Sequence, residues 1–105
     1  MPPQEIPSET LKSTDVPEAG AAWSEIQEFA LTFNGYSFWN GFDRCAAIAN
    51  AKQPQNLTEL RTCLFFEQRR WRHFGETPDA ESMAYIRTLV NGIREEVDRI
   101  RRSSP

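Results

Sequence analysis

The chain has 105 residues, of which 39% are hydrophobic, with three Trp, seven Phe and two Tyr and a formal net charge of -3. This length allows one domain with a modest core, and the acidic balance argues against a general nucleic-acid coat protein. No apolar run approaches the roughly 18 residues that a membrane span requires, and residues 1–7 lack the features of a signal peptide. We therefore expect one small cytoplasmic domain without a membrane partner.

Residues 1–18 are predicted to form a disordered leader. They contain four prolines among Ser, Thr and Glu, and too few apolar groups to offset the entropy lost on ordering. Over residues 1–33, six acidic residues against a single lysine give a local charge of -5. The acidic leader could fold back over a basic surface, and the folded domain is expected over residues 19–103.

Two helices are predicted in the first half of the domain. Over residues 20–34, Trp23, Ile26 and Phe29 recur at helical spacing, and a stop signal follows at residues 34–35. Over residues 37–51, a continuous helix would place the apolar residues on one side and the polar residues on the other. The alternative is a turn at Asn40 and Gly41 followed by a shorter helix. We favour the continuous helix.

The third helix is predicted over residues 57–74, with Asn56 as its N-cap, Glu59 three residues later, and Gly75 at its end. It carries more apolar surface than one buried face requires. Projected at about 100° per residue, one stripe gathers on a single side. Its members are Leu57, Leu60, Cys63, Leu64, Trp71 and Phe74. Phe65 and Phe66 project away from this stripe, so something else must cover them.

The fourth helix is predicted over residues 78–102. Thr77 would cap it, Pro78 would occupy its first position, and Asp79 would lie in its first turn. One apolar stripe runs along its length, and no strand pattern or internal repeat is visible. The fold class is therefore all-α, a compact bundle of about four helices with short connections.

Phe65 and Phe66 have two interpretations. Either the third helix is central in the bundle and covered on two or more sides, or one ring lies in an exposed patch that docks a partner or a second copy of the chain. Aromatic and Arg side chains dominate the residues that contribute most to binding at interfaces. The helix that carries these rings also has a local charge of +2 over residues 57–75.

Arg69, Arg70 and Arg72 cluster with His73 between aromatic residues. Such a cluster could bind phosphates while a ring stacks on a base. Helical geometry, however, places Trp71 and Phe74 on the core stripe, away from the arginines. The other interpretations are arginines that are solvated or paired within the chain, or a patch for an acidic protein partner.

Glu67 is the one charge within the apolar stripe. A buried carboxylate is costly unless it is paired, so we expect an Arg or a Trp indole from another helix to meet it. A buried carboxylate can also act as a general acid or base, but the spacing identifies no second catalytic group. Cys45 and Cys63 are expected to be reduced and packed as small hydrophobes. With one histidine and no Gly-rich phosphate loop, no metal site or cofactor is predicted.

The leading hypothesis is a small helical interaction module, a regulatory or accessory subunit, that binds a protein partner or a second copy of itself. The predicted partner-binding residues are Phe65, Phe66, Arg69, Arg70, Arg72 and His73. A nucleic-acid-binding protein that uses the arginine cluster is the second hypothesis. A small helical enzyme that uses Glu67 is the third, although no catalytic residue is assigned.

Overall fold

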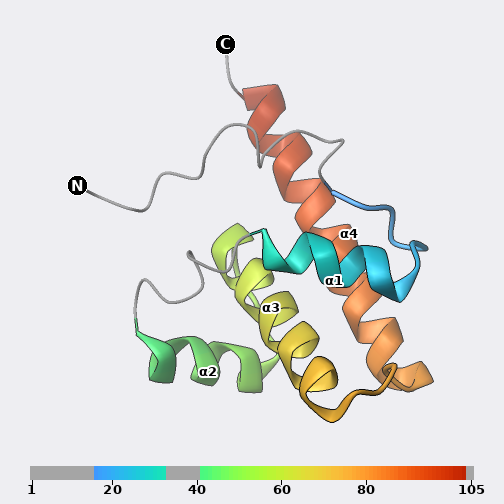
Figure 1. The fold of residues 1–105 in the computed structure, drawn as a ribbon. Coiled ribbons are helices and arrows are strands. Elements are labelled where there is room, and N and C mark those ends of the chain that lie inside the picture. The colour runs from blue at the N-terminus through green and yellow to red at the C-terminus, as the bar shows by residue number, and fades with distance from the viewer. Residues whose placement is uncertain (1–15, 33–40, 104–105) are drawn as a thin grey trace.

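The computed structural model describes residues 16–32 and 41–103, and these residues contain four helices and no strand (Figure 1). The helices are α1 (Trp23–Leu31), α2 (Phe42–Ala51), α3 (Leu57–Phe74) and α4 (Ala80–Ser103). The predicted all-α bundle is therefore confirmed. No helix in the described part of the chain is long and apolar enough to cross a bilayer.

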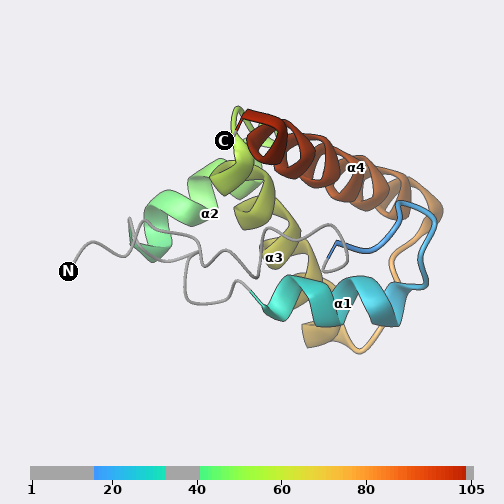
Figure 2. The ribbon, with the colours of Figure 1, turned by 90° about the horizontal axis from the view of Figure 1, so that it is seen from above.

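Helix α3 is the centre of the bundle. It contacts α1, α2 and α4, and the view from above shows the other three helices arranged around it (Figure 2). The core forms where the apolar stripes of α1, α3 and α4 meet. Its most deeply buried apolar side chains include Ile26, Leu64, Ile86, Leu89, Val90, Ile93 and Val97.

Helix α1 is shorter than predicted. It begins at Trp23 rather than at residue 20, and both the backbone N–H and the hydroxyl of Thr32 donate hydrogen bonds to the carbonyl of Phe29 at its end. The predicted stop at residues 34–35 lies outside the described residues. Ile26, Phe29 and Ala30 face the core, as the helical spacing of the apolar residues predicts.

Helix α2 begins at Phe42, so the continuous helix predicted over residues 37–51 is wrong at its start. Gly41 precedes the helix with φ +93°, a left-handed conformation that glycine adopts without the penalty that a Cβ would bring. The alternative interpretation, a shorter helix after Gly41, describes the chain here, although residues 37–40 lie outside the described part. At the other end, Lys52 closes α2 in the left-handed helical conformation.

Helix α3 has the predicted bounds because both of its ends are specified locally. The Asn56 side chain accepts a hydrogen bond from the backbone N–H of Glu59 at 2.9 Å. The Glu59 carboxylate in turn accepts one from the backbone N–H of Gln55, the residue before the cap, so this variant of the capping box holds the chain on both sides of Asn56. Gly75 ends the helix at φ +66°, and its N–H donates to the carbonyl of Arg72.

Helix α4 begins two residues later than predicted. The cap is Asp79, whose carboxylate accepts a hydrogen bond from the backbone N–H of Ser82 at 2.8 Å. This bond is the main reason why the pKa of Asp79 lies below its ordinary value. Thr77 and Pro78 therefore precede the helix. Further along α4, Gly92 lies against Leu60 of α3, where a Cβ would lie 3.1 Å from one Leu60 methyl carbon.

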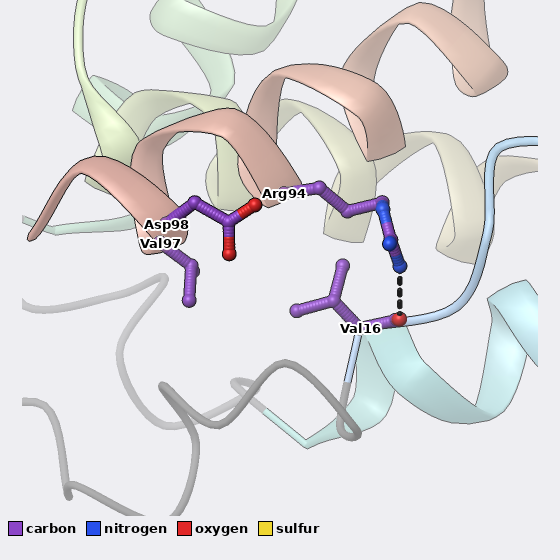
Figure 3. Close-up of a pocket in the computed structure, with 4 residues that line it drawn as sticks. All are labelled: Val16, Arg94, Val97 and Asp98. Carbon is purple, nitrogen blue, oxygen red and sulfur yellow. Dashed lines mark hydrogen bonds between the residues drawn. The ribbon is translucent and has the colours of Figure 1, made fainter. Parts of the chain in front are cut away.

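Residues 16–22 pack against α4, so the folded part begins before residue 19, the predicted boundary. Val16 is buried in the core, and Arg94 donates a hydrogen bond to its carbonyl at 2.9 Å (Figure 3). Seven residues earlier on α4, which is about two turns, Arg87 donates to the carbonyl of Ala19 at 2.6 Å. The space between Val16, Arg94, Val97 and Asp98 measures about 10 Å³, which is about the size of one water molecule. Residues 1–15 of the predicted leader lie outside the described part.

Candidate functional site

An open groove of about 270 Å³ lies between the start of α2 and the last turns of α3. Its lining combines three phenylalanine rings, two guanidinium groups and one imidazole. The lining residues are Phe42, Phe66, Arg69, Arg70, His73 and Phe74. All but Phe42 come from α3, where Phe66, Arg69, Arg70 and His73 follow the i, i+3, i+4, i+7 spacing of one helix face.

The apolar side of the groove is built from aromatic rings in mutual contact. The centroids of Phe42 and Phe66 are 5.4 Å apart with the ring planes tilted by 43°. Phe66 also meets Phe65 edge-on, with centroids 6.0 Å apart. Phe65 itself is buried in the core. The ring pair that lines the groove is therefore anchored to the core through Phe65.

Phe74 is 61% exposed, so its predicted place on the core stripe is wrong. Its ring meets the imidazole of His73 edge-on, with centroids 5.2 Å apart. In helical phase, Phe74 continues the stripe that contains the buried Cys63. The last turn of α3, however, lies beyond the part of the helix that its neighbours cover, and residues 72–76 are all exposed. Phe42 is also exposed, at 49%.

The two groove arginines lie against aromatic rings. The guanidinium carbon of Arg69 is 5.5 Å from the centroid of Phe42, and that of Arg70 is 5.5 Å from the centroid of Trp71. These are cation–π distances. Within the described ranges neither arginine forms a salt bridge, whereas Arg99 pairs with Glu96 at 2.7 Å. The two guanidinium groups of the groove thus lie beside aromatic rings, and no carboxylate among residues 16–32 and 41–103 forms a salt bridge with them.

The groove unites four of the six predicted partner-binding residues: Phe66, Arg69, Arg70 and His73. Phe65 does not belong to the groove because its ring is buried. For Phe65, this agrees with the interpretation in which the third helix is central in the bundle and covered on several sides. Arg72 is exposed but does not line the groove. Sequence reasoning missed Phe42, because the start of α2 was misplaced, and it missed Phe74, because helical phase alone does not show where a covering helix ends.

Glu67 is 7% exposed, and its Oε1 accepts a hydrogen bond from the indole N–H of Trp71 at 3.3 Å. The indole donor was predicted, but it comes from the same helix and not from another one. Glu67 lines neither the groove nor the small space beside Val16. This buried and bonded carboxylate gives the enzyme hypothesis no support.

A second group of buried polar atoms lies where α2, α3 and α4 meet. The Cys63 thiol donates a hydrogen bond to the carbonyl of Ile48 at 3.8 Å, and burial raises its pKa. Burial, and then the Cys63 thiol, raise the pKa of the Tyr85 phenol. Cys45 and Cys63 are both buried thiols outside any disulfide, as predicted. A protonated and buried thiol is a poor nucleophile.

Among the residues that the structure describes, no group of three or more His, Cys, Asp and Glu side chains could hold a metal ion. Comparison of the chain with protein-family models, with curated proteins and with solved structures finds no significant match. The groove residues themselves are therefore the basis for a functional assignment.

Proposed function

We propose that this chain is a small helical protein-interaction module, a regulatory or accessory subunit, that docks another protein through the groove between α2 and α3. The observation that carries the proposal is one helix face that presents Phe66, Arg69, Arg70 and His73 together, bordered by the exposed rings of Phe42 and Phe74. Exposed aromatic side chains beside arginines are the combination enriched at protein interfaces.

The size of the groove supports a protein ligand. Sites for drug-sized molecules usually enclose about 300–1,000 Å³, whereas this groove measures about 270 Å³ and is open to solvent. It is suited to one or two side chains of a docked segment. We also propose a cytoplasmic location, which the two buried cysteine thiols outside any disulfide support.

A photo-crosslinking experiment tests the docking function. The full chain is made with benzoylphenylalanine in place of Phe74, and matched chains carry it in place of Arg101, an exposed residue near the end of α4. We expect crosslinks to a protein from position 74 and not from position 101. The crosslinked protein is then purified, and its affinity is measured for the original chain and for the double variant R69E/R70E, which should bind about tenfold more weakly.

Nucleic-acid binding is the second candidate, and the exposed Phe74 ring favours it. A base could stack on this ring while Arg69 and Arg70 contact phosphates. In the same crosslinking experiment, this function would give a crosslinked species that is digested by nuclease. The affinity of the chain for an RNA oligonucleotide would also fall steeply as the salt concentration rises. Light scattering of the purified chain at several concentrations identifies a second copy as the partner.

A further inference from the structure

We infer that the groove recognises an acidic segment of a partner protein that carries one large apolar side chain between its carboxylates. This inference rests on the proposed docking function and adds the chemistry of the ligand. The apolar side chain would lie on the rings of Phe42 and Phe66, and the carboxylates on either side of it would accept hydrogen bonds from Arg69 and Arg70.

The apolar part of the ligand follows from the shape of the site. The Phe42 and Phe66 rings form one surface with their centroids 5.4 Å apart, and the Phe74 ring borders the groove at 61% exposure. Covering these rings with another apolar group removes their surface from water, which contributes about 25 cal/mol per Å². A segment with only small polar side chains would leave them in contact with water.

The acidic part follows from the charge of the site. Arg69 and Arg70 have no salt-bridge partner among residues 16–32 and 41–103, while Arg87 and Arg94 already donate to backbone carbonyls and Arg99 to Glu96. Their guanidinium carbons lie 5.5 Å from the centroids of the Phe42 and Trp71 rings. An arginine that stacks on a ring keeps its N–H donors free at the edge, where a carboxylate can accept two of them.

The extent of the charge favours a short acidic segment over a nucleic acid. Proteins with strongly salt-dependent DNA affinity make about 6–10 phosphate contacts, and only two guanidinium groups line this groove. Carboxylates follow directly in the chain, at Glu76 and Asp79. The pKa of Asp79 is lowered mainly by its hydrogen bonds from Ser82 and also by the charge of Arg70, so Asp79 lies within the field of the groove. These carboxylates would repel a ligand whose negative charge continues past the two arginines, as a phosphate backbone does and a short acidic segment does not.

The test uses the full chain and short fluorescein-labelled peptides of defined sequence. The first peptide places one Phe among Glu residues, the second replaces every Glu by Lys, and the third replaces the Phe by Ala. Fluorescence anisotropy measures the dissociation constants at low and at physiological salt. We expect the first peptide to bind at least about tenfold more tightly than either of the others.

A charge exchange makes the test specific for the groove. R69E/R70E should lose affinity for the Glu peptide by about tenfold or more and gain affinity for the Lys peptide. The matched control is R101E/R102E, which changes the net charge equally at exposed positions at the far end of α4 (Figure 1) and should leave the preference unchanged. Circular dichroism confirms that both variants are folded.

The inference is overturned if the Glu peptide binds no better than the Lys peptide, if R101E/R102E changes the preference as much as R69E/R70E does, or if an RNA oligonucleotide binds more tightly than the Glu peptide.

Failure of the docking function itself has a different signature, because position 74 then gives no protein crosslink. If that position crosslinks a partner whose docked segment is basic, the docking function stands and the acidic ligand is wrong. Competition by a peptide of residues 1–18 for the Glu peptide would identify the chain's own acidic leader as a ligand of the stated chemistry.

Discussion

The indole N–H of Trp71 donates a hydrogen bond to the buried carboxylate of Glu67 one turn earlier on α3. This contact explains how a charged residue is tolerated within an apolar stripe, since the donor is supplied by the same helix at i+4. It also fixes the indole ring against which the Arg70 guanidinium lies. A buried contact thus supports one of the two cations that line the groove.

Replacing Trp71 by Phe should lower the free energy of unfolding by about 1–3 kcal/mol, because the buried carboxylate loses its donor. Glu67→Gln keeps an acceptor oxygen and should cost less. The matched control is Trp23→Phe, a half-buried Trp packed on the same core, whose indole has no described hydrogen bond. Urea denaturation measures all three variants. Equal losses for Trp71→Phe and Trp23→Phe would show that the hydrogen bond contributes nothing.

Phe65 and Phe74 should respond in opposite ways to truncation. Phe65→Ala removes a buried core ring and should cost about 3–5 kcal/mol of stability. Phe74→Ala changes a mostly exposed side chain and should stay within about 0.5 kcal/mol, while it weakens binding at the groove. Thermal denaturation and the peptide titration together test this division. If Phe65→Ala were stable but bound the peptide more weakly, Phe65 would be a binding residue of the docking surface, as first predicted.

The close approach of Gly92 to Leu60 makes the effect of Gly92→Ala depend on its neighbour. Alanine is favoured over glycine within a helix by about 1 kcal/mol, but its Cβ would lie 3.1 Å and 3.4 Å from the two Leu60 methyl carbons. In the original chain we expect this crowding to cancel the gain or to exceed it. In a Leu60→Ala background the same substitution should stabilise by about 1 kcal/mol. If urea denaturation showed that Gly92→Ala changes the free energy of unfolding equally in both backgrounds, the crowding against Leu60 would be excluded.

Arg87 and Arg94 should hold residues 16–22 on α4. Substituting either one by Gln weakens a charge-assisted hydrogen bond to a backbone carbonyl and should cost about 1–2 kcal/mol. Hydrogen exchange gives a local measurement: the amide of Ala21, which donates to the Glu18 carbonyl, should exchange faster in both variants. Arg101→Gln serves as the control. Unchanged exchange at Ala21 would mean that the arginines do not anchor this segment.

Stability should fall in alkaline solution because the buried Cys63 thiol and the phenol of the half-buried Tyr85 hold their protons more tightly in the folded state. The pKa of the Cys63 thiol is raised above its ordinary value of 9.0, and the pKa of the Tyr85 phenol is raised above 10.0. Their contribution is fully present below pH 9.0, where both states are protonated, and is lost as the pH rises above that value. Urea denaturation from neutral to alkaline pH should show the decline, and Tyr85→Phe should make it shallower. The same slope in both proteins would remove Tyr85 from this effect.

Much of the fold could be read from local signals along the chain. Asn56 and Gly75 define both ends of α3 through backbone geometry that involves only nearby residues, and the periodic apolar residues of α4 face the core as predicted. Errors arose where two local signals competed. Thr77 and Asp79 can both cap a helix. In the structure, the Asp79 carboxylate accepts the hydrogen bond from the backbone N–H of Ser82 and is therefore the cap. Gly41 fits the helical period, but it takes up the left-handed conformation that precedes α2.

The sequence by itself therefore determined the all-α class, the ends of α3 and the helix face that carries Phe66, Arg69, Arg70 and His73, because these depend on contacts within a few residues. Only the tertiary structure decided which rings are covered. Phe65 is buried because α3 has neighbours on several sides, whereas Phe74 is exposed because its turn extends beyond them. Phe42 joins the groove across a sequence separation of 24 residues from Phe66. Helical periodicity gives the direction of a side chain, but the length and position of a neighbouring element determine whether water reaches it.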